Sequence, residues 1–327
     1  MTESGADVRQ RRERVVGAVL GSAVGDALGA PFEFGPAGMF GARFPGAATM
    51  CGGGGWDAGE ATDDTQLAVH LGESLLAAGG LDLPDMFERF RGWAAGGPKD
   101  IGIQTEIVLG GGLPWDLAAA VHFQTEGRAA GNGALMRAVT GAVWFAPQGR
   151  AATMAAARRI TALTHGDGAA WEGTAILHEL LRVALDGGDP LAAVPRTLAA
   201  VRAEHRERWA RVLAPDWRPE LATESNGAVW ACLGSALWAL RVTGGFPDAL
   251  RAVIDLGGDT DTTAAVTGGL AGAVYGADAI PDAWLGPLHV PLPPTGRVLR
   301  AGELAALAVA LDAGGRGEVA GGRVRGW

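Results

Sequence analysis

Two short stretches of the chain place acidic and hydroxyl side chains directly before apolar segments that fit helices. These residues are Thr62, Asp63 and Asp64 in the first acidic head, and Asp259, Asp261 and Thr262 in the second acidic head. Such side chains suit the first turn of a helix, because free backbone N–H groups and the helix dipole favour negative charge there. If the two heads meet in space, four carboxylates share one pocket and need a cation. Oxygen ligands of this kind favour Mg²⁺ or Mn²⁺ over zinc.

Each acidic head alone also fits an ordinary helix cap. A cap needs one side-chain oxygen, whereas each head offers several, and this redundancy favours a binding site. A calcium-binding EF-hand loop that starts at Asp259 is excluded. Ala264 stands where that loop needs glycine, and Leu270 stands where it needs a bidentate glutamate.

Two further residues near these motifs stand out. Asp26 lies within the apolar segment 14–30, where an unpaired carboxylate would be costly. It is either a hydrogen-bonded structural residue or part of the polar site, and the sequence leaves both open. Trp56 lies shortly before the first acidic head, where it could stack on an adenine or shape the pocket.

The composition indicates a soluble globular protein, since 48% of the 327 residues are apolar and 19% are charged. The net charge of −9 does not indicate a nucleic-acid partner. Cys51 and Cys232 lack metal or redox spacing and fit a reducing compartment. No apolar core of a secretory signal follows the N-terminal arginines, and no uninterrupted apolar run reaches the ~20 residues of a membrane span. We therefore expect a cytoplasmic protein without a membrane segment.

Apolar residues recur with helical spacing along most of the chain, and alternating β patterns are almost absent. The segments predicted to be helical are 14–30, 67–78, 85–94, 103–109, 118–123, 135–144, 151–163, 169–184, 190–207, 229–241, 247–256, 260–275 and 301–313. Glycine allows close helix contacts, so we predict an all-α fold, a compact single-domain helical bundle. The domain is expected to span residues 13–313, between a frayed N-terminal lead at 1–12 and a flexible Gly/Arg tail at 314–327.

Three motifs together resemble the ADP-ribosylglycohydrolase family: GSAVGDALG at 21–29, TDDT at 62–65 and GDTDT at 258–262. The similarity extends from about Val15 to about Gly276 and includes five motifs in the family's order, which is more specific than any single motif. It implies a helical fold of the ADP-ribosylglycohydrolase type with two Mg²⁺ or Mn²⁺ ions as cofactors. The six residues of the acidic heads match the family's ligand positions, and Asp261 would also act in catalysis.

The same resemblance implies roles for residues outside the acidic heads. Glu33 and Asp100 would be catalytic: Glu33 would contact metal or substrate from a mobile flap, and Asp100 would face the leaving group. Asn132 and Gly133 would hold the ribose and phosphates, and His165 would also contact the substrate. By themselves, these residues would be a solvated loop carboxylate, a turn residue, a helix cap and a structural histidine.

The implied reaction is hydrolysis of the glycosidic bond between ADP-ribose and an acceptor, with release of ADP-ribose. Such cleavage passes through an oxocarbenium-like state and is helped by protonation of the leaving group and activation of water. Two metal ions could bind ribose hydroxyls and lower the pKa of water. An arginine linkage on a mono-ADP-ribosylated protein is favoured, because Asp100 can bind a guanidinium bidentately. Serine-linked, nucleic-acid-linked and small-molecule conjugates stay open, and we expect a monomer.

Three other functions compete with this one. An isoprenoid synthase also uses aspartates and Mg²⁺, but its Asp-Asp-x-x-Asp pattern fails at Leu67. A phosphatase of the Asp-x-Asp-x-Thr type matches 259–263, but it needs a lysine after the motif, and the single lysine, Lys99, comes far earlier. The third alternative is a non-catalytic ADP-ribose-binding relative. The six intact ligand positions argue against it.

Overall fold

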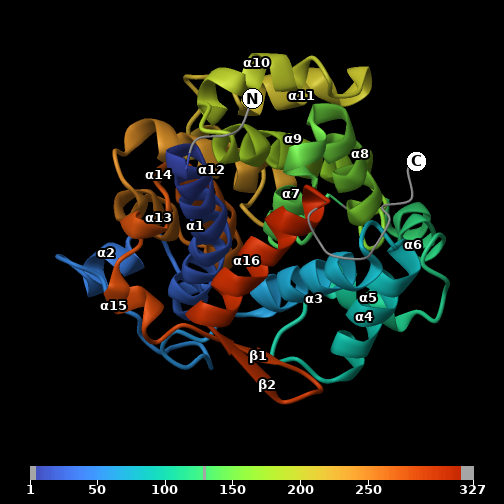
Figure 1. The fold of residues 1–327 in the computed structure, drawn as a ribbon, viewed down its shortest axis with the longest axis horizontal. Helices are drawn as coiled ribbons and strands as arrows, with labels where there is room; N and C mark the ends of the chain where they lie inside the picture. Colours follow the sequence, from blue (N-terminus) through green and yellow to red (C-terminus); the bar gives the residue numbers. More distant parts are fainter. Residues whose placement is uncertain (1–4, 128–129, 318–327) are drawn as a thin grey trace.

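The computed structural model describes residues 5–127 and 130–317, which form sixteen α-helices, four short 3-10 helices and one two-stranded hairpin. The predicted all-α class is therefore confirmed (Figure 1), and the two most closely packed helices form a largely buried central pair. One large apolar core extends from the first helix to the last.

The central pair consists of α1 (Gly5–Gly29) and α14 (Thr260–Tyr275). Four glycines spaced four residues apart form the contact face of α1: Gly17, Gly21, Gly25 and Gly29. A Cβ atom on any of them would stand between 2.1 and 2.5 Å from a carbonyl oxygen of α14. Their facing residues run backward along α14 as Gly272, Gly268, Ala264 and Thr260, so the two helices are antiparallel. Only glycine permits this backbone contact, which brings the end of α1 to the start of α14.

The remaining helices pack on this pair or on one another. Those on the N-terminal side of the chain are α2 (Met39–Arg43), α3 (Asp63–Ala78), α4 (Leu83–Ala95), α5 (Ile103–Gly110), α6 (Ala118–Glu126), α7 (Ala138–Phe145) and α8 (Arg150–Thr161). Those that follow are α9 (Gly168–Leu185), α10 (Pro190–Leu198), α11 (Ala203–Val212), α12 (Val229–Val242), α13 (Phe246–Ile254), α15 (Asp282–Leu285) and α16 (Ala301–Gly315). The 3-10 helices are η1 (Ala30–Phe32), η2 (Ala146–Gln148), η3 (Pro219–Leu221) and η4 (Ala277–Ala279). Helices α12 and α13 pack on α14, and α16 packs on α1.

The hairpin of β1 (His289–Leu292) and β2 (Arg297–Arg300) was not predicted. Prolines in and after β1 hide its strand pattern, since proline lacks the N–H of a strand ladder. The strands are antiparallel, and His289 lies opposite Arg300. The backbone of His289 also bonds to Gly59 and Ala61, at 2.8 and 2.9 Å. The hairpin therefore braces the loop that leads into the first acidic head.

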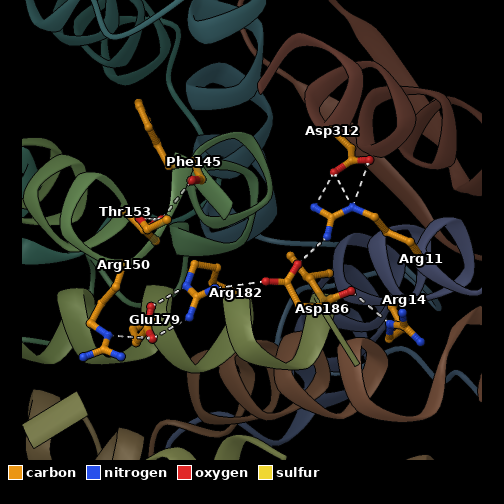
Figure 2. A network of polar contacts seen from close by, with 11 residues as sticks. Arg11, Arg14, Phe145, Arg150, Thr153, Glu179, Arg182, Asp186 and Asp312 are labelled. Atoms are coloured by element: carbon orange, nitrogen blue, oxygen red, sulfur yellow. Dashed lines mark hydrogen bonds and ion pairs between the residues drawn. The ribbon is translucent and has the colours of Figure 1, made fainter. Parts of the chain in front are cut away.

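The expected frayed lead at residues 1–12 is wrong from Gly5 onward, because α1 begins there. Arg11 explains why this segment is a folded helix. Its side chain is buried and forms ion pairs with Asp186 at 2.6 Å and Asp312 at 2.7 Å, which tie α1 to α9 and α16 (Figure 2). Residues 1–4 lie outside the described residues.

Two other predicted boundaries also change. The single helix expected at 190–207 is two helices, α10 and α11, separated by a turn at 199–202. The flexible tail expected from residue 314 is wrong at Gly314 and Gly315, which belong to α16 and lie tightly against Trp144. The rest of that expected tail, 318–327, lies outside the described residues.

Within 5–127 and 130–317, one helical segment, Gly5–Phe32, is long and apolar enough to cross a membrane by length and composition alone. The sequence analysis did not foresee this. Inside the protein, 89% of its apolar window is buried, as in a core helix.

Candidate active site

The structure brings the two acidic heads together. The first head begins α3, where Thr62 is the N-cap and its side chain accepts a hydrogen bond from the N–H of Asp64 at 3.3 Å. The second head begins α14. Thr262 Oγ1 donates to Asp64 Oδ1 at 3.5 Å, which links the two heads directly across almost two hundred residues of sequence. Neither head is a solvated cap, because the carboxylates on both helices are buried.

The carboxylates of the two acidic heads are surrounded by fewer hydrogen-bond donors than their negative charge requires. Asp64 Oδ2 and Asp259 Oδ1 are buried and have no hydrogen-bond partner among the described residues. Burial, and then the neighbouring carboxylates, raise the pKa of Asp63, Asp64 and Asp261 well above the usual range. Buried carboxylates in this state favour a counter-charge. Unpartnered oxygens aimed into a shared pocket fit a hard divalent cation.

Asp26 supports the first head and is not one of the unpartnered carboxylates. It accepts hydrogen bonds from the N–H of Thr62 at 3.0 Å and from the N–H and Oγ1 of Thr65 at 3.1 and 2.5 Å. Burial raises its pKa to about 6, against the lowering effect of these bonds. Of the two interpretations left open by the sequence, these contacts favour the structural one, in which α1 fixes the start of α3.

Asn226 supports the second head, and the sequence analysis missed it. Its Nδ2 donates to the carbonyl oxygens of Gly257 and Asp259, and its Oδ1 accepts from the N–H of Asp259 at 3.0 Å. Gly257 and Gly258 have φ values of +72° and +70°, so the approach to α14 needs glycine. The available signal was the Asn-Gly pair at 226–227, which is typical of a loop with special backbone geometry.

Glu33 lies beside the second head. One ligand atom from each of Glu33, Asp259 and Asp261 lies within 4.8 Å of the others. The backbone next to Glu33 is anchored: Phe34 N–H donates to Gly258 O at 2.7 Å, and Gly258 N–H donates to Gly35 O at 3.0 Å. A closing motion of the expected flap at Glu33 would have to break these bonds. Burial and the charges of nearby carboxylates, first among them Asp100, raise the pKa of Glu33 to about 8.

Asp100 lies close enough to this site for its charge to raise the pKa of Glu33 and of Asp63. The preceding residue, Lys99, fixes this turn by an ion pair with Glu60 at 2.7 Å and by lying 5.5 Å from the ring centre of Trp56. Trp56 is only 8% exposed and has Lys99 over its ring, so it shapes the pocket wall and does not offer a free stacking face.

A second group of possible metal ligands consists of Asp57, Glu60 and His289. Its buried member, Glu60, already accepts hydrogen bonds from Lys99 and from the N–H of Asp57. Glu60 Oε2 is therefore neutralised by protein donors, which distinguishes it from Asp64 Oδ2 and Asp259 Oδ1.

The predicted substrate loop also adjoins the second head. Asn132 Nδ2 donates to Asp259 Oδ2 at 2.8 Å and to Asn226 O at 3.0 Å. A Cβ atom on Gly133 would lie 3.2 Å from His165 Cε1, so the glycine permits the ring to approach. The structure thus gathers Asn132, Gly133 and His165 beside the acidic pocket.

Comparison with known proteins decides the family. The family profile described as ADP-ribosylglycohydrolase matches residues 7–317, nearly the entire chain. The chain belongs to the ADP-ribosylglycohydrolase family. It is 32% identical to the ADP-ribosyl-[dinitrogen reductase] glycohydrolase of Rhodospirillum rubrum over 85% of this chain and 91% of that protein. It is 30% identical to the ADP-ribosylarginine hydrolase Tri1 of Pseudomonas putida, over 84% of this chain and 74% of that protein. A solved structure titled "ADP-ribosylglycohydrolase-related protein complex" superposes with a TM-score of 0.74 at 34% identity, covering 94% of this chain and 99% of that chain.

This ADP-ribosylglycohydrolase is a glycosyl hydrolase, as are the relatives whose names describe that activity. The isoprenoid-synthase and phosphatase alternatives are therefore excluded. The predicted fold type is also confirmed by the structural match.

Proposed function

We propose that this enzyme hydrolyses the N-glycosidic bond between ADP-ribose and an arginine side chain of a mono-ADP-ribosylated protein. The observation that carries this proposal is that the charge of Asp100 acts on Glu33 and on Asp63 of the first acidic head. A carboxylate there complements a guanidinium bidentately, whereas a serine hydroxyl would leave its charge unpaired. Two relatives are named for ADP-ribosylarginine or for ADP-ribosyl-dinitrogen reductase, which supports the same substrate class.

Two divalent cations, Mg²⁺ or Mn²⁺, are the proposed cofactors. The residues that would hold them are Thr62, Asp63, Asp64, Asp259, Asp261 and Thr262. The unpartnered oxygens of Asp64 and Asp259 support this assignment, since hydrogen bonds within the described protein leave them unsatisfied. When bound, such cations supply Lewis acidity toward oxygen atoms of the substrate and of water.

The protein groups have separate tasks in the proposed reaction. The 131–133 loop and His165 bind the ADP-ribose so that the anomeric carbon faces the acidic pocket. In its ionised form, Glu33 accepts a proton from the attacking water while the C–O bond forms and the C–N bond to the guanidine breaks. That proton then passes to the departing guanidine nitrogen, and Asp100 stabilises the guanidinium product. Asp261, which lies next to Glu33, would keep the reacting oxygen oriented.

The remaining proposals rest on features of the amino-acid sequence. The partner is an ADP-ribosylated protein, the enzyme acts as a monomer, and its location is the cytoplasm. The free cysteines Cys51 and Cys232 and the net charge of −9 support a cytoplasmic enzyme that does not depend on nucleic acid.

A substrate panel tests the proposed function. Arginine-linked, serine-linked and nucleotide-linked ADP-ribose conjugates are incubated with the enzyme, and released ADP-ribose is measured with and without a chelator. We expect release from the arginine-linked substrate, and loss of that release after chelation. Preference for another linkage would contradict the arginine assignment. Binding of ADP-ribose without release from any substrate would point to the non-catalytic alternative.

A further inference from the structure

Arg137 is a fully buried cation beside the site. It has 0% exposure, and its Nη1 donates to the carbonyl oxygen of Gly133 at 3.2 Å. The guanidinium lies 4.8 Å from the ring centre of Phe90, and its Nε has no hydrogen-bond partner among the described residues. Burial lowers its pKa to about 10, against the opposite effect of Asp63, so it stays charged at neutral pH. Keeping a cation buried with so few contacts is costly, which indicates a specific role.

The remaining contact of Arg137 leads to His165. Its Nη2 donates to Thr164 Oγ1 at 2.6 Å, and Thr164 Oγ1 lies 2.8 Å from His165 Nδ1. A guanidinium can only donate hydrogen bonds, so the threonine oxygen must accept from Arg137. A hydroxyl oxygen can accept two hydrogen bonds, so the contact with Arg137 leaves the direction of its own hydrogen open. Among the described residues, His165 Nδ1 is the one acceptor within reach of Thr164 Oγ1, so donation to Nδ1 satisfies that hydrogen. This network places the ring hydrogen of His165 on Nε2.

The other edge of the His165 ring faces the substrate loop. His165 Nε2 lies 3.4 Å from the position of a Cβ on Gly133 and 3.5 Å from that of a Cβ on Gly131. The backbone of His165 is held as well, because its carbonyl oxygen accepts the indole N–H of Trp171 at 2.5 Å. Burial, then Arg137 and His122, lower the pKa of His165 to about 3. The ring therefore stays neutral throughout the physiological pH range.

We propose that Arg137 is a positioning residue that acts through Thr164 to fix His165 as a neutral Nε2–H donor toward the ADP-ribose held by the 131–133 loop. The part of this proposal that concerns the ligand rests on the proposed function. The part that concerns the tautomer does not. A donor that never charges can bind the diphosphate or ribose oxygens with the same geometry at every pH at which the enzyme works. A mixture of tautomers would present an acceptor to those oxygens part of the time.

The test uses histidine-labelled ¹⁵N protein without substrate, in which nitrogen shifts report the tautomer. Thr164→Val removes the hydroxyl, Thr164→Ser retains it, and Thr161→Val is the matched control. Thr161 is equally buried, but its hydroxyl bonds only to Ala157 O of its own helix, at 2.8 Å. We expect a single Nε2–H tautomer in wild type, Thr164→Ser and Thr161→Val, and a mixture in Thr164→Val. Arg137→Met should also give a mixture. If that variant does not fold, the shorter Arg137→Gln gives the same comparison.

Binding is measured separately with ADP-ribose itself. The dissociation constant should rise about 10-fold in Thr164→Val and stay near the wild-type value in the two other threonine variants, as for the loss of one hydrogen bond. An Nδ1–H tautomer in wild type, or an unchanged tautomer in either Thr164→Val or the Arg137 variant, would overturn the proposal. An altered tautomer with unchanged ADP-ribose affinity would remove His165 from the substrate contacts. Because neither readout uses turnover, a failure of the arginine-linkage assignment would be seen separately in the substrate panel.

Discussion

Thr260 Oγ1 donates a hydrogen bond to the carbonyl oxygen of Gly29 at 2.9 Å, where the end of α1 meets the start of α14. This contact is the last of four that repeat every four residues along the two helices. It places Asp261 one residue beyond the junction and Asp26 one turn before it. The close packing of α1 and α14 therefore places the start of the second acidic head at the end of α1, close to Asp26, which supports the first acidic head.

Two adjacent glycines on α14 test this packing. A Cβ on Gly268 would lie 2.0 Å from Gly21 O, whereas a Cβ on Gly269 would meet nothing closer than 3.7 Å. Gly268→Ala should lower the free energy of unfolding by at least about 2 kcal/mol, because the backbones must separate. Gly269→Ala should raise it by about 0.5–1 kcal/mol through helix propensity. Denaturant melts measure both, and similar effects of the two substitutions would contradict the close contact.

The sequence predicted the helical class and the two acidic heads, because both leave local patterns. That the heads meet was a condition of the metal-site hypothesis, and the structure supplies it. The glycines on α1 are also visible in the sequence at intervals of four. Their partners are not, since the spacing of small residues does not say which helix they meet. The hairpin was missed because Pro291 interrupts its pattern, and the start of α1 was missed because Arg11 is ordered by acidic partners that are distant in sequence.

The acidic residues of the site could be predicted from the sequence, but the residues that hold them in place could not. Asp63 and Asp259 belong to recognisable motifs, whereas Asn226 bonds mainly to backbone atoms of a loop more than thirty residues away. Arg137 resembles any helix-associated arginine until its burial is known. Such roles depend on tertiary contacts, which a single sequence does not reveal.

Asn226→Ala should weaken metal binding without unfolding the protein. The substitution leaves the N–H of Asp259 without its acceptor, so the ligand loses its fixed orientation. We expect about a 10-fold or greater loss of Mn²⁺ affinity in a thermal-shift titration. Ser225→Ala is the control, because Ser225 is exposed and adjacent. Equal Mn²⁺ affinities in both variants would remove Asn226 from the support of the site.

Glu33→Gln should impair turnover and stabilise the chelated protein at high pH. The folded pKa of about 8 lies above the ordinary value of 4.5, so stability contributed by protonated Glu33 is lost as the pH rises from 4.5 to 8. Glutamine does not ionise and avoids this loss. The melting temperature of the variant, relative to wild type, should therefore rise between pH 4.5 and pH 8. Exposed Glu106→Gln should show no such trend, and wild-type turnover in Glu33→Gln would contradict the catalytic role.

His178 should make the fold sensitive to acid. Its Nδ1 lies 3.0 Å from Thr174 O, its Nε2 has no partner among the described residues, and burial lowers its pKa from 6.5 to about 4. The unfolded chain therefore binds a proton that the folded protein does not, and stability is lost as the pH falls from 6.5 to 4. His178→Leu should be more favourable at pH 5 than at pH 8 by about 2 kcal/mol relative to wild type. A difference that does not change with pH would show that His178 does not titrate in this way.

The central claim is that the two acidic heads form one cation site. It is tested by the melting temperature of metal-stripped protein as Mg²⁺ or Mn²⁺ is added back to wild type and to the double variant Asp63→Asn, Asp259→Asn. Wild type should gain stability with the logarithm of the metal concentration, because cations bind the folded state. The double variant should lose this dependence and retain its metal-free stability, since asparagine also relieves repulsion between carboxylates. Asp57→Asn, in the second group of possible ligands near the hairpin, should respond to metal as wild type does. Equal metal-induced shifts in wild type and the double variant would contradict the claim and leave the acidic heads as helix caps.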